Sequence, residues 1–118
     1  MILNWQLLQE TEQNVFAINF NTGNFGLQTL RLSGTIKVLD SGAFTNHKNL
    51  KQVYIGNAGT ASQLTSVGEA PFSGCGANVT DFKITYYYPT GSPFSDSTVA
   101  KLKSSISSAT INVEGIAV

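Results

Sequence analysis

Residues 36–55, IKVLDSGAFTNHKNLKQVYI, are repeated in altered form by residues 64–84, LTSVGEAPFSGCGANVTDFKI. The matching positions pair as Ile36/Leu64, Leu39/Val67, Phe44/Phe72, His47/Cys75, Leu50/Val79, Val53/Phe82 and Ile55/Ile84. The offset is 28 residues up to the His47/Cys75 pair and 29 residues beyond it, which indicates a one-residue loop insertion. A short unit that repeats in this way cannot bury its apolar face alone, so it predicts a fold of stacked units.

The second half of each unit predicts a β-strand. The spacing L-x-x-L-x-L occurs at Leu27/Leu30/Leu32, Leu50/Val53/Ile55, Val79/Phe82/Ile84 and, more weakly, Ser108/Ile111/Val113. Because side chains alternate along a strand, the last two apolar residues of each triplet share one face. The residues between them, which we expect on the opposite face, are Arg31, Tyr54, Lys83 and Asn112. The pattern therefore predicts four strands with one apolar face.

The repeated unit resembles that of the BspA-like bacterial leucine-rich repeats, which reads roughly L-x-x-I-x-x-x-A-F-x-x-C-x-x-L-x-x-V-x-I. Residues 36–55 fit this unit with His47 in the Cys position, and residues 64–75 fit it with Pro71 in the Ala position. The resemblance covers about residues 27–85. It implies an α/β fold: a short right-handed solenoid with a parallel sheet of about four strands and irregular or short helical connections opposite.

The two ends depart from the repeat, as terminal units of stacked-repeat proteins do because they shield the open core. We interpret residues 1–26 as an N-terminal cap and residues 27–118 as the leucine-rich-repeat domain with a C-terminal capping unit, together one structural domain. Hydroxyl and carboxyl oxygens at 95–98 can cap a helix. The apolar residues that would form one face of this capping helix are Val99, Leu102 and Ile106.

Composition excludes several functional classes. The chain has 118 residues, a hydrophobic share of 42%, and seven basic against seven acidic residues in no single-sign cluster. Nucleic acid and anionic membranes are therefore poor partners. No apolar run is long enough to span a membrane, and residues 1–8 lack the features of a signal peptide. One Cys and one His exclude an intrachain disulfide and the usual zinc sites, so we expect no metal and no cofactor.

Candidate catalytic residues are few. Cys75 and His47 are the one nucleophile and base that could pair, since equivalent positions of adjacent units lie about 5 Å apart. Both occupy the same repeat position, and no third group orients the imidazole, so we expect them to be structural. The carboxylates of Asp40 and Glu69 also fall in neighbouring units, where solvated or turn-capping roles are expected. We therefore predict that the chain has no catalytic residues and is not an enzyme.

The outward face of the predicted sheet is the candidate binding surface. Its two expected rows are Thr29, Gln52, Asp81 and Thr110, and Arg31, Tyr54, Lys83 and Asn112. In this arrangement Tyr54 stands between two cations and could anchor a partner. The alternative is a stabilising cation–π ladder of the same residues.

A second candidate surface is the cluster of Tyr86, Tyr87 and Tyr88, because alternation sends at least one ring outward. The alternative is that these rings pack against the C-terminal helix.

We expect a non-enzymatic binding module. The resemblance implies a bacterial surface or secreted protein that mediates adhesion, protein–protein or host contact, with another protein or cell-surface macromolecule as partner. The alternative is a structural spacer or assembly unit of a larger or oligomeric protein, joined through the exposed ends of the solenoid.

Overall fold

The computed structural model describes residues 2–4, 15–16 and 28–118. The elements are β1 (Ile2–Asn4), β2 (Val15–Phe16), β3 (Thr29–Leu32), β4 (Val38–Leu39), β5 (Gln52–Ile55), β6 (Ser66–Val67), β7 (Asp81–Tyr88), α1 (Asp96–Lys103) and β8 (Thr110–Ala117). Apart from β1 and β2, the predicted N-terminal cap of residues 1–26 lies outside the described residues. The described chain has an α/β fold with one helix.

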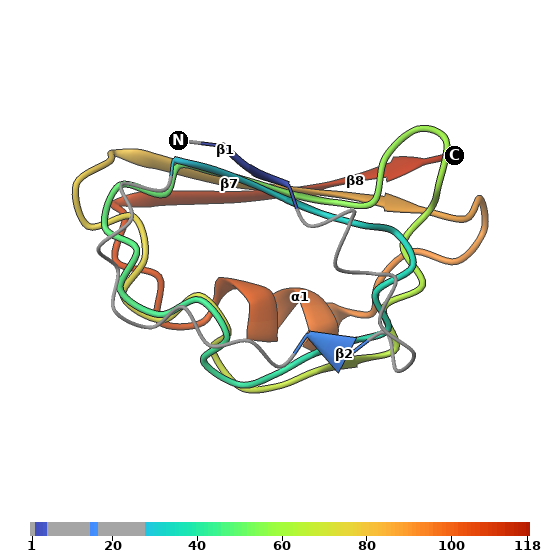
Figure 1. The fold of residues 1–118 in the computed structure, drawn as a ribbon, viewed down its shortest axis with the longest axis horizontal. Coiled ribbons are helices and arrows are strands. Elements are labelled where there is room, and N and C mark those ends of the chain that lie inside the picture. The colour runs from blue at the N-terminus through green and yellow to red at the C-terminus, as the bar shows by residue number, and fades with distance from the viewer. Residues whose placement is uncertain (1, 5–14, 17–27) are drawn as a thin grey trace.

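The strands form two parallel sheets. The larger has the order β1-β3-β5-β7-β8, and the smaller has the order β2-β4-β6. From β3 to β7 successive strands alternate between the sheets, so the chain crosses the molecule after each strand. Figure 1 shows the larger sheet along one side with α1 opposite it. The four strands that the apolar triplets predict are β3, β5, β7 and β8, and the predicted parallel sheet is confirmed.

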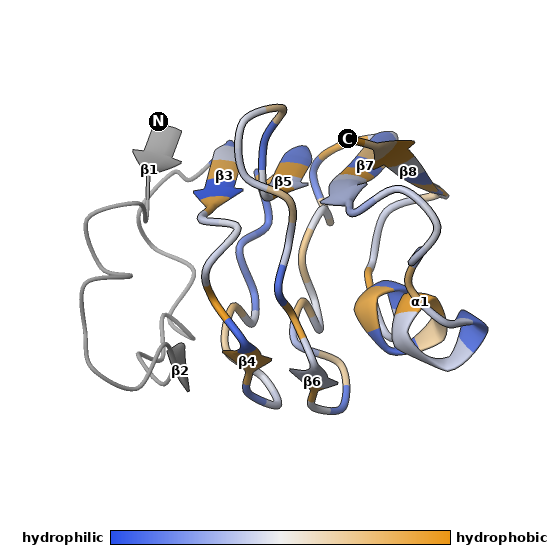
Figure 2. Cartoon of the chain, turned by 90° about the vertical axis from the view of Figure 1, so that its right-hand side faces the viewer, coloured by the Kyte–Doolittle hydropathy of each residue, from blue (hydrophilic) through white to orange (hydrophobic). Residues whose placement is uncertain are grey.

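The inward face of the larger sheet is apolar. The inward residues predicted on β3, β5 and β7 are buried, and those on the edge strand β8, Ile111 and Val113, are partly buried. The buried set is Leu30, Leu32, Val53, Ile55, Phe82 and Ile84. Figure 2 shows β3, β5, β7 and β8 side by side, with β4 and β6 on the opposite side. Between them Phe44 and Phe72 are fully buried, and their rings stack at 5.8 Å between centroids and 18° between planes. This confirms that the two phenylalanines occupy equivalent positions of adjacent units.

The register of the larger sheet follows the apolar pattern at one step and departs from it at the next. Leu30 lies beside Val53, as the triplets predict. Val53 in turn lies beside Ile84, whereas the triplets place Phe82 there. The rows of side chains predicted across β5 and β7 are therefore wrong by two residues.

The turn before β7 packs directly against a buried ring of that strand. The Val79 N–H donates to the Gly76 carbonyl oxygen at 3.1 Å, and Gly76 adopts φ 77°, a left-handed conformation that favours glycine. A Cβ on Gly76 would lie 2.9 Å from the ring of Phe82, so the turn packs directly on that ring. Val79 is half-buried. The turn before β5 has the same hydrogen bond, from the Leu50 N–H to the His47 carbonyl oxygen at 3.1 Å, so the two units enter β5 and β7 by equivalent turns.

The C-terminal helix α1 covers the end of the core beside β6 and β8. Ser95 caps its N-terminus, accepting a hydrogen bond from the Thr98 N–H at 3.2 Å, as the sequence predicts. Leu102 is fully buried. The helix is shorter than predicted because Ser104 has extended backbone angles and Ser105 has φ 62°. Ile106 therefore lies beyond the helix, although it is still buried.

Candidate functional site

Two rows of mostly polar side chains follow the outward face of β3, β5, β7 and β8. In the observed register the rows are Thr29, Gln52, Lys83 and Asn112, and Arg31, Tyr54, Thr85 and Glu114. The predicted rows are corrected accordingly: Lys83 lies beside Gln52, and Thr85 takes its expected place beside Tyr54. Asp81 is exposed and lies beside Thr110, not beside Gln52. Tyr54 therefore has one cation beside it in its row.

Two neighbouring side chains contact Tyr54, Arg31 at the ring and Gln52 at the hydroxyl group. The guanidinium carbon of Arg31 lies 4.5 Å from the ring centroid, which is a cation–π contact. The Tyr54 hydroxyl donates to Oε1 of Gln52 at 2.8 Å. Arg31 is exposed, while Tyr54 and Gln52 are half-buried. The three side chains form a fixed aromatic and cationic group on the surface.

Lys83 belongs to a separate ion pair. Its Nζ lies 2.9 Å from Oε1 of Glu114 on the neighbouring strand. The hydrogen bond and charge of Glu114 raise the pKa of the Lys83 ammonium. Both side chains are about half exposed, with relative exposures of 50% and 54%, so solvent screens the attraction. The pair fixes the position of Lys83 more than it stabilises the fold.

The three consecutive tyrosines have different surroundings. Tyr86 is buried, and its ring stacks on Phe94 at 4.2 Å between centroids and 5° between planes. Tyr88 is half-buried, 5.7 Å from the ring of Tyr86. Tyr87 alternates to the outward face, where it is half-buried. Of the three, Tyr87 alone adds to the outward face, whereas Tyr86 packs on Phe94, which precedes α1, and on Tyr88.

Tyr86 also explains a glycine in β8. Gly115 lies beside Tyr86, and a Cβ there would meet the ring at 2.6 Å from Cζ. Desolvation by burial is the main cause that raises the pKa of the Tyr86 hydroxyl. The ring is thus packed between Phe94 and the backbone of the edge strand, away from any partner.

Cys75 and His47 are both buried, as the shared repeat position predicts. The Cys75 thiol donates to the Phe44 carbonyl oxygen at 2.8 Å. Desolvation by burial raises the pKa of this thiol from 9.0 to about 12. A hydrogen bond with the backbone of His47 lowers the pKa by a smaller amount. At neutral pH the thiolate that a nucleophile requires is not populated. The buried sulfur links residues 44 and 75 of the two repeated segments.

The carboxylates of Asp40 and Glu69, which fall in neighbouring units, lie on the surface. Asp40 and Glu69 are exposed, and the Glu69 N–H is held by the Ser41 hydroxyl at 2.8 Å. Over residues 2–4, 15–16 and 28–118, no three His, Cys, Asp or Glu side chains gather where they could hold a metal ion. Nor does that part of the chain contain a helix long and apolar enough to cross a membrane.

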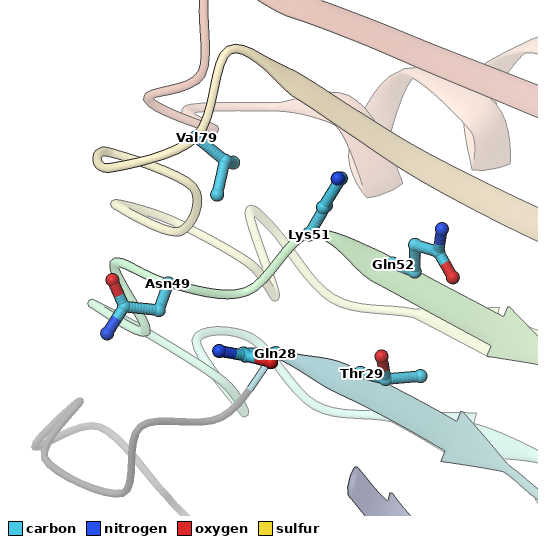
Figure 3. A pocket seen from close by; sticks show the side chains of 6 residues that line it. All are labelled: Gln28, Thr29, Asn49, Lys51, Gln52 and Val79. Atoms are coloured by element: carbon cyan, nitrogen blue, oxygen red, sulfur yellow. The ribbon is translucent and has the colours of Figure 1, made fainter. Parts of the chain in front are cut away.

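A polar pocket of about 370 Å³, which the repeat pattern does not predict, lies where β3 and β5 begin. Its lining residues are Gln28, Thr29, Asn49, Lys51, Gln52 and Val79 (Figure 3). Thr29 and Gln52 come from the outward face, and the others come from the segments that precede the strands. One signal was present in the repeat: an Asn precedes the strand triplet in both units, as Asn49 and Asn78, and the two amides are hydrogen-bonded.

Comparison of the chain with models of protein families, with characterised proteins and with solved structures gives no match. The fold and the arrangement of side chains are therefore the basis for the function proposed below.

Proposed function

We propose that the chain is a non-enzymatic binding module, a short solenoid of the leucine-rich-repeat type that binds another protein through the outward face of its larger sheet. The resemblance of residues 36–55 and 64–75 to the BspA-like unit supports the solenoid. The stacking of Phe44 on Phe72 supports it from the structure, because equivalent residues of adjacent units meet in the core. On the same resemblance we place the protein at a bacterial surface or among secreted proteins, in adhesion or host contact.

The group formed by Arg31, Tyr54 and Gln52 is the observation that carries the binding proposal. Tyrosine and arginine are the residues that most often dominate binding energy at protein interfaces. Here the tyrosine is fixed before any partner arrives, by the cation–π contact and by the hydroxyl hydrogen bond. A side chain already held in place loses less conformational entropy on binding, which favours affinity. Lys83, held by Glu114, adds a second fixed cation nearby.

The experiment that tests this proposal separates folding from binding. Replacement of Arg31, Tyr54 and Lys83 together by Ser removes three outward side chains and no inward one. We expect the free energy of unfolding to fall by about 2 kcal/mol or less, since surface substitutions have small effects. The control variant replaces Lys37, Lys48 and Lys103 by Ser, which are exposed residues away from this face.

The readout is the dissociation constant of a partner first captured by wild-type protein from surface proteins and then purified. Loss of binding in the Arg31/Tyr54/Lys83 variant with retention in the control variant supports the proposal. Equal binding by both variants contradicts it.

A second function, assembly with other chains, rests on the edge strand β8. Strand order places β8 at the end of the larger sheet, where its eight residues pair along one side with β7. A long edge strand with few charges invites pairing with another strand. Sedimentation at increasing protein concentration tests it: association that Asn112→Lys abolishes supports assembly, and a monomer at all concentrations contradicts it.

A further inference from the structure

The open edge of β8 presents the backbone groups of alternate residues. The Thr110 N–H donates to the Thr80 carbonyl oxygen at 3.0 Å, so Thr110 points its backbone groups toward β7. Since backbone groups point alternately to the two sides of a strand, the other even-numbered residues of β8 do the same. The backbone groups of Ile111 and Val113 therefore point away from β7. Figure 2 shows this side of β8 at the end of the sheet.

β8 lacks the features that commonly protect an edge strand from pairing. Natural edge strands are very short, carry Lys or Pro, or are interrupted by a bulge. β8 has eight residues without Lys or Pro, and they pair in unbroken succession with β7. Its one charged side chain, Glu114, is already paired with Lys83 at 2.9 Å. The opposite edge of the sheet is the three-residue strand β1, so β8 of a second copy matches this strand better in length.

The sequence of β8 complements itself when two copies run antiparallel with Asn112 on the twofold axis. The two Asn112 amides then lie opposite each other and can exchange hydrogen bonds. On the outward face Thr110 of one copy lies opposite Glu114 of the second copy, which sets a hydroxyl donor beside a carboxylate. On the inward face Ile111 lies opposite Val113 of the second copy, an apolar pair that also exchanges the free backbone hydrogen bonds.

The neighbouring antiparallel registers match less well. With Val113 on the axis, Ile111 lies opposite Gly115, which has no side chain to pack against it. With Glu114 on the axis, two carboxylates lie directly opposite, which destabilises the pair. With Ile111 on the axis, the pairing soon reaches Ala109, where the chain bends.

We propose that a second copy of the chain pairs antiparallel with β8 around Asn112 and forms a closed dimer. This dimer rests on the assembly proposed above for β8 and specifies its partner, orientation and register. Both copies use the same edge, so pairing stops at two copies. Side chains keep their faces across the shared sheet, and the two outward faces therefore lie on one side. A partner with two matching sites would bind both groups of Arg31, Tyr54 and Gln52 with increased avidity.

Cysteine on the axis tests the register. In the pair that Asn112 forms with itself the Cα atoms lie about 4.5 Å apart, so Asn112→Cys should link two copies. Glu114→Cys is the matched control, because it is exposed on the same face but would lie roughly 14 Å from its equivalent. In a glutathione redox buffer at micromolar protein, we expect Asn112→Cys to form the linked dimer about tenfold faster or more. Cys75 is buried and stays in place.

Two lysine variants test the charge pattern by sedimentation of the whole chain. Wild type should form a dimer and grow no further as its concentration rises. Asn112→Lys would bring two ammonium groups together on the axis, so it should abolish the dimer. Thr110→Lys adds the same charge to the same face of β8 but opposite Glu114 of the second copy. The dimer of this variant should persist.

A monomer at all concentrations would overturn both the assembly and the dimer. Three other results overturn the antiparallel dimer and leave assembly through β8 standing. They are growth beyond two copies, equal linkage of the two cysteine variants, and loss of association in both lysine variants. The sheet-face site is tested separately, because none of these variants replaces Arg31, Tyr54 or Lys83.

Discussion

The step from β3 to β5 and the step from β5 to β7 use the same apolar pattern in the same sheet, yet they differ in register. In the first step Leu30 lies beside Val53, as the pattern predicts. In the second, Val53 lies beside Ile84, two residues beyond the predicted partner. A slip of one residue would turn every side chain to the other face, whereas a slip of two leaves both faces unchanged. The apolar pattern therefore specifies which face is buried but not the register between neighbouring strands.

The register decides the geometry of the candidate sites. With the predicted register Tyr54 would stand between Arg31 and Lys83 on neighbouring strands. In the structure Tyr54 has Arg31 on one side and the buried Thr85 on the other. Lys83 instead lies beside Gln52 and pairs with Glu114, so the two cations belong to separate groups.

We expect the largest loss of stability from substitutions of Phe44 and Phe72, which lie where the two units keep the predicted alignment. Phe44→Ala or Phe72→Ala should each reduce the free energy of unfolding by about 3–5 kcal/mol, because each empties a fully buried ring position. Denaturant unfolding measures the loss, and Phe72→Leu, which keeps most of the volume, should cost less. A loss below about 1 kcal/mol at both positions would show that these rings do not stack across the two units.

The buried thiol of Cys75 should make the free energy of unfolding depend on pH. Cys75 lies where the repeat offset changes from 28 to 29 residues. Since the folded pKa of Cys75 is raised from 9.0 to about 12, the unfolded chain loses its thiol proton first as the pH rises. The stability due to this shift is complete below pH 9 and is lost between pH 9 and pH 12, at about 1.4 kcal/mol per pH unit.

Comparison with Cys75→Ser isolates this loss from that of other groups, because serine does not titrate in this range. The difference in unfolding free energy between wild type and variant should change across pH 9–12. A constant difference would mean that the thiol ionises equally in both states.

The sequence predicts the strands, their buried face and the capped helix for a common physical reason. Each depends on local spacing: period two in Leu30 and Leu32, and a capping oxygen at Ser95 before an apolar face. The stack of Tyr86 on Phe94 depends on the path of the chain after β7, which local spacing does not specify. The polar pocket joins Thr29 to Gln52 in the predicted register, but its other lining residues come from the segments before the strands, whose path local spacing does not specify.

A smaller effect tests the contact between β7 and β8, whose register follows the apolar pattern. Gly115→Ala should lower the free energy of unfolding by about 1–3 kcal/mol, because its methyl group would overlap the ring of Tyr86. In a Tyr86→Leu background the same substitution should cost less, which a double-mutant cycle measures. Gly59→Ala, with ordinary space around its Cβ, is the control. Equal costs in the two backgrounds would remove Tyr86 from this contact.

Disulfide formation across β5 and β7 tests the displaced register most directly. In a Cys75→Ser background, one variant carries Gln52→Cys with Lys83→Cys, the neighbours that the structure shows. The comparison variant carries Tyr54→Cys with Lys83→Cys, the neighbours that the repeat pattern alone predicts. Adjacent strands lie about 4.8 Å apart, so a true pair is within disulfide range, whereas a two-residue offset separates the Cα atoms by roughly 8 Å.

Mild oxidation followed by counting of the remaining free thiols gives the result. We expect the Gln52/Lys83 pair to close while the Tyr54/Lys83 pair stays reduced. Closure of the Tyr54/Lys83 pair with the Gln52/Lys83 pair still reduced would contradict the register of β5 and β7 and the geometry of the proposed sheet-face site.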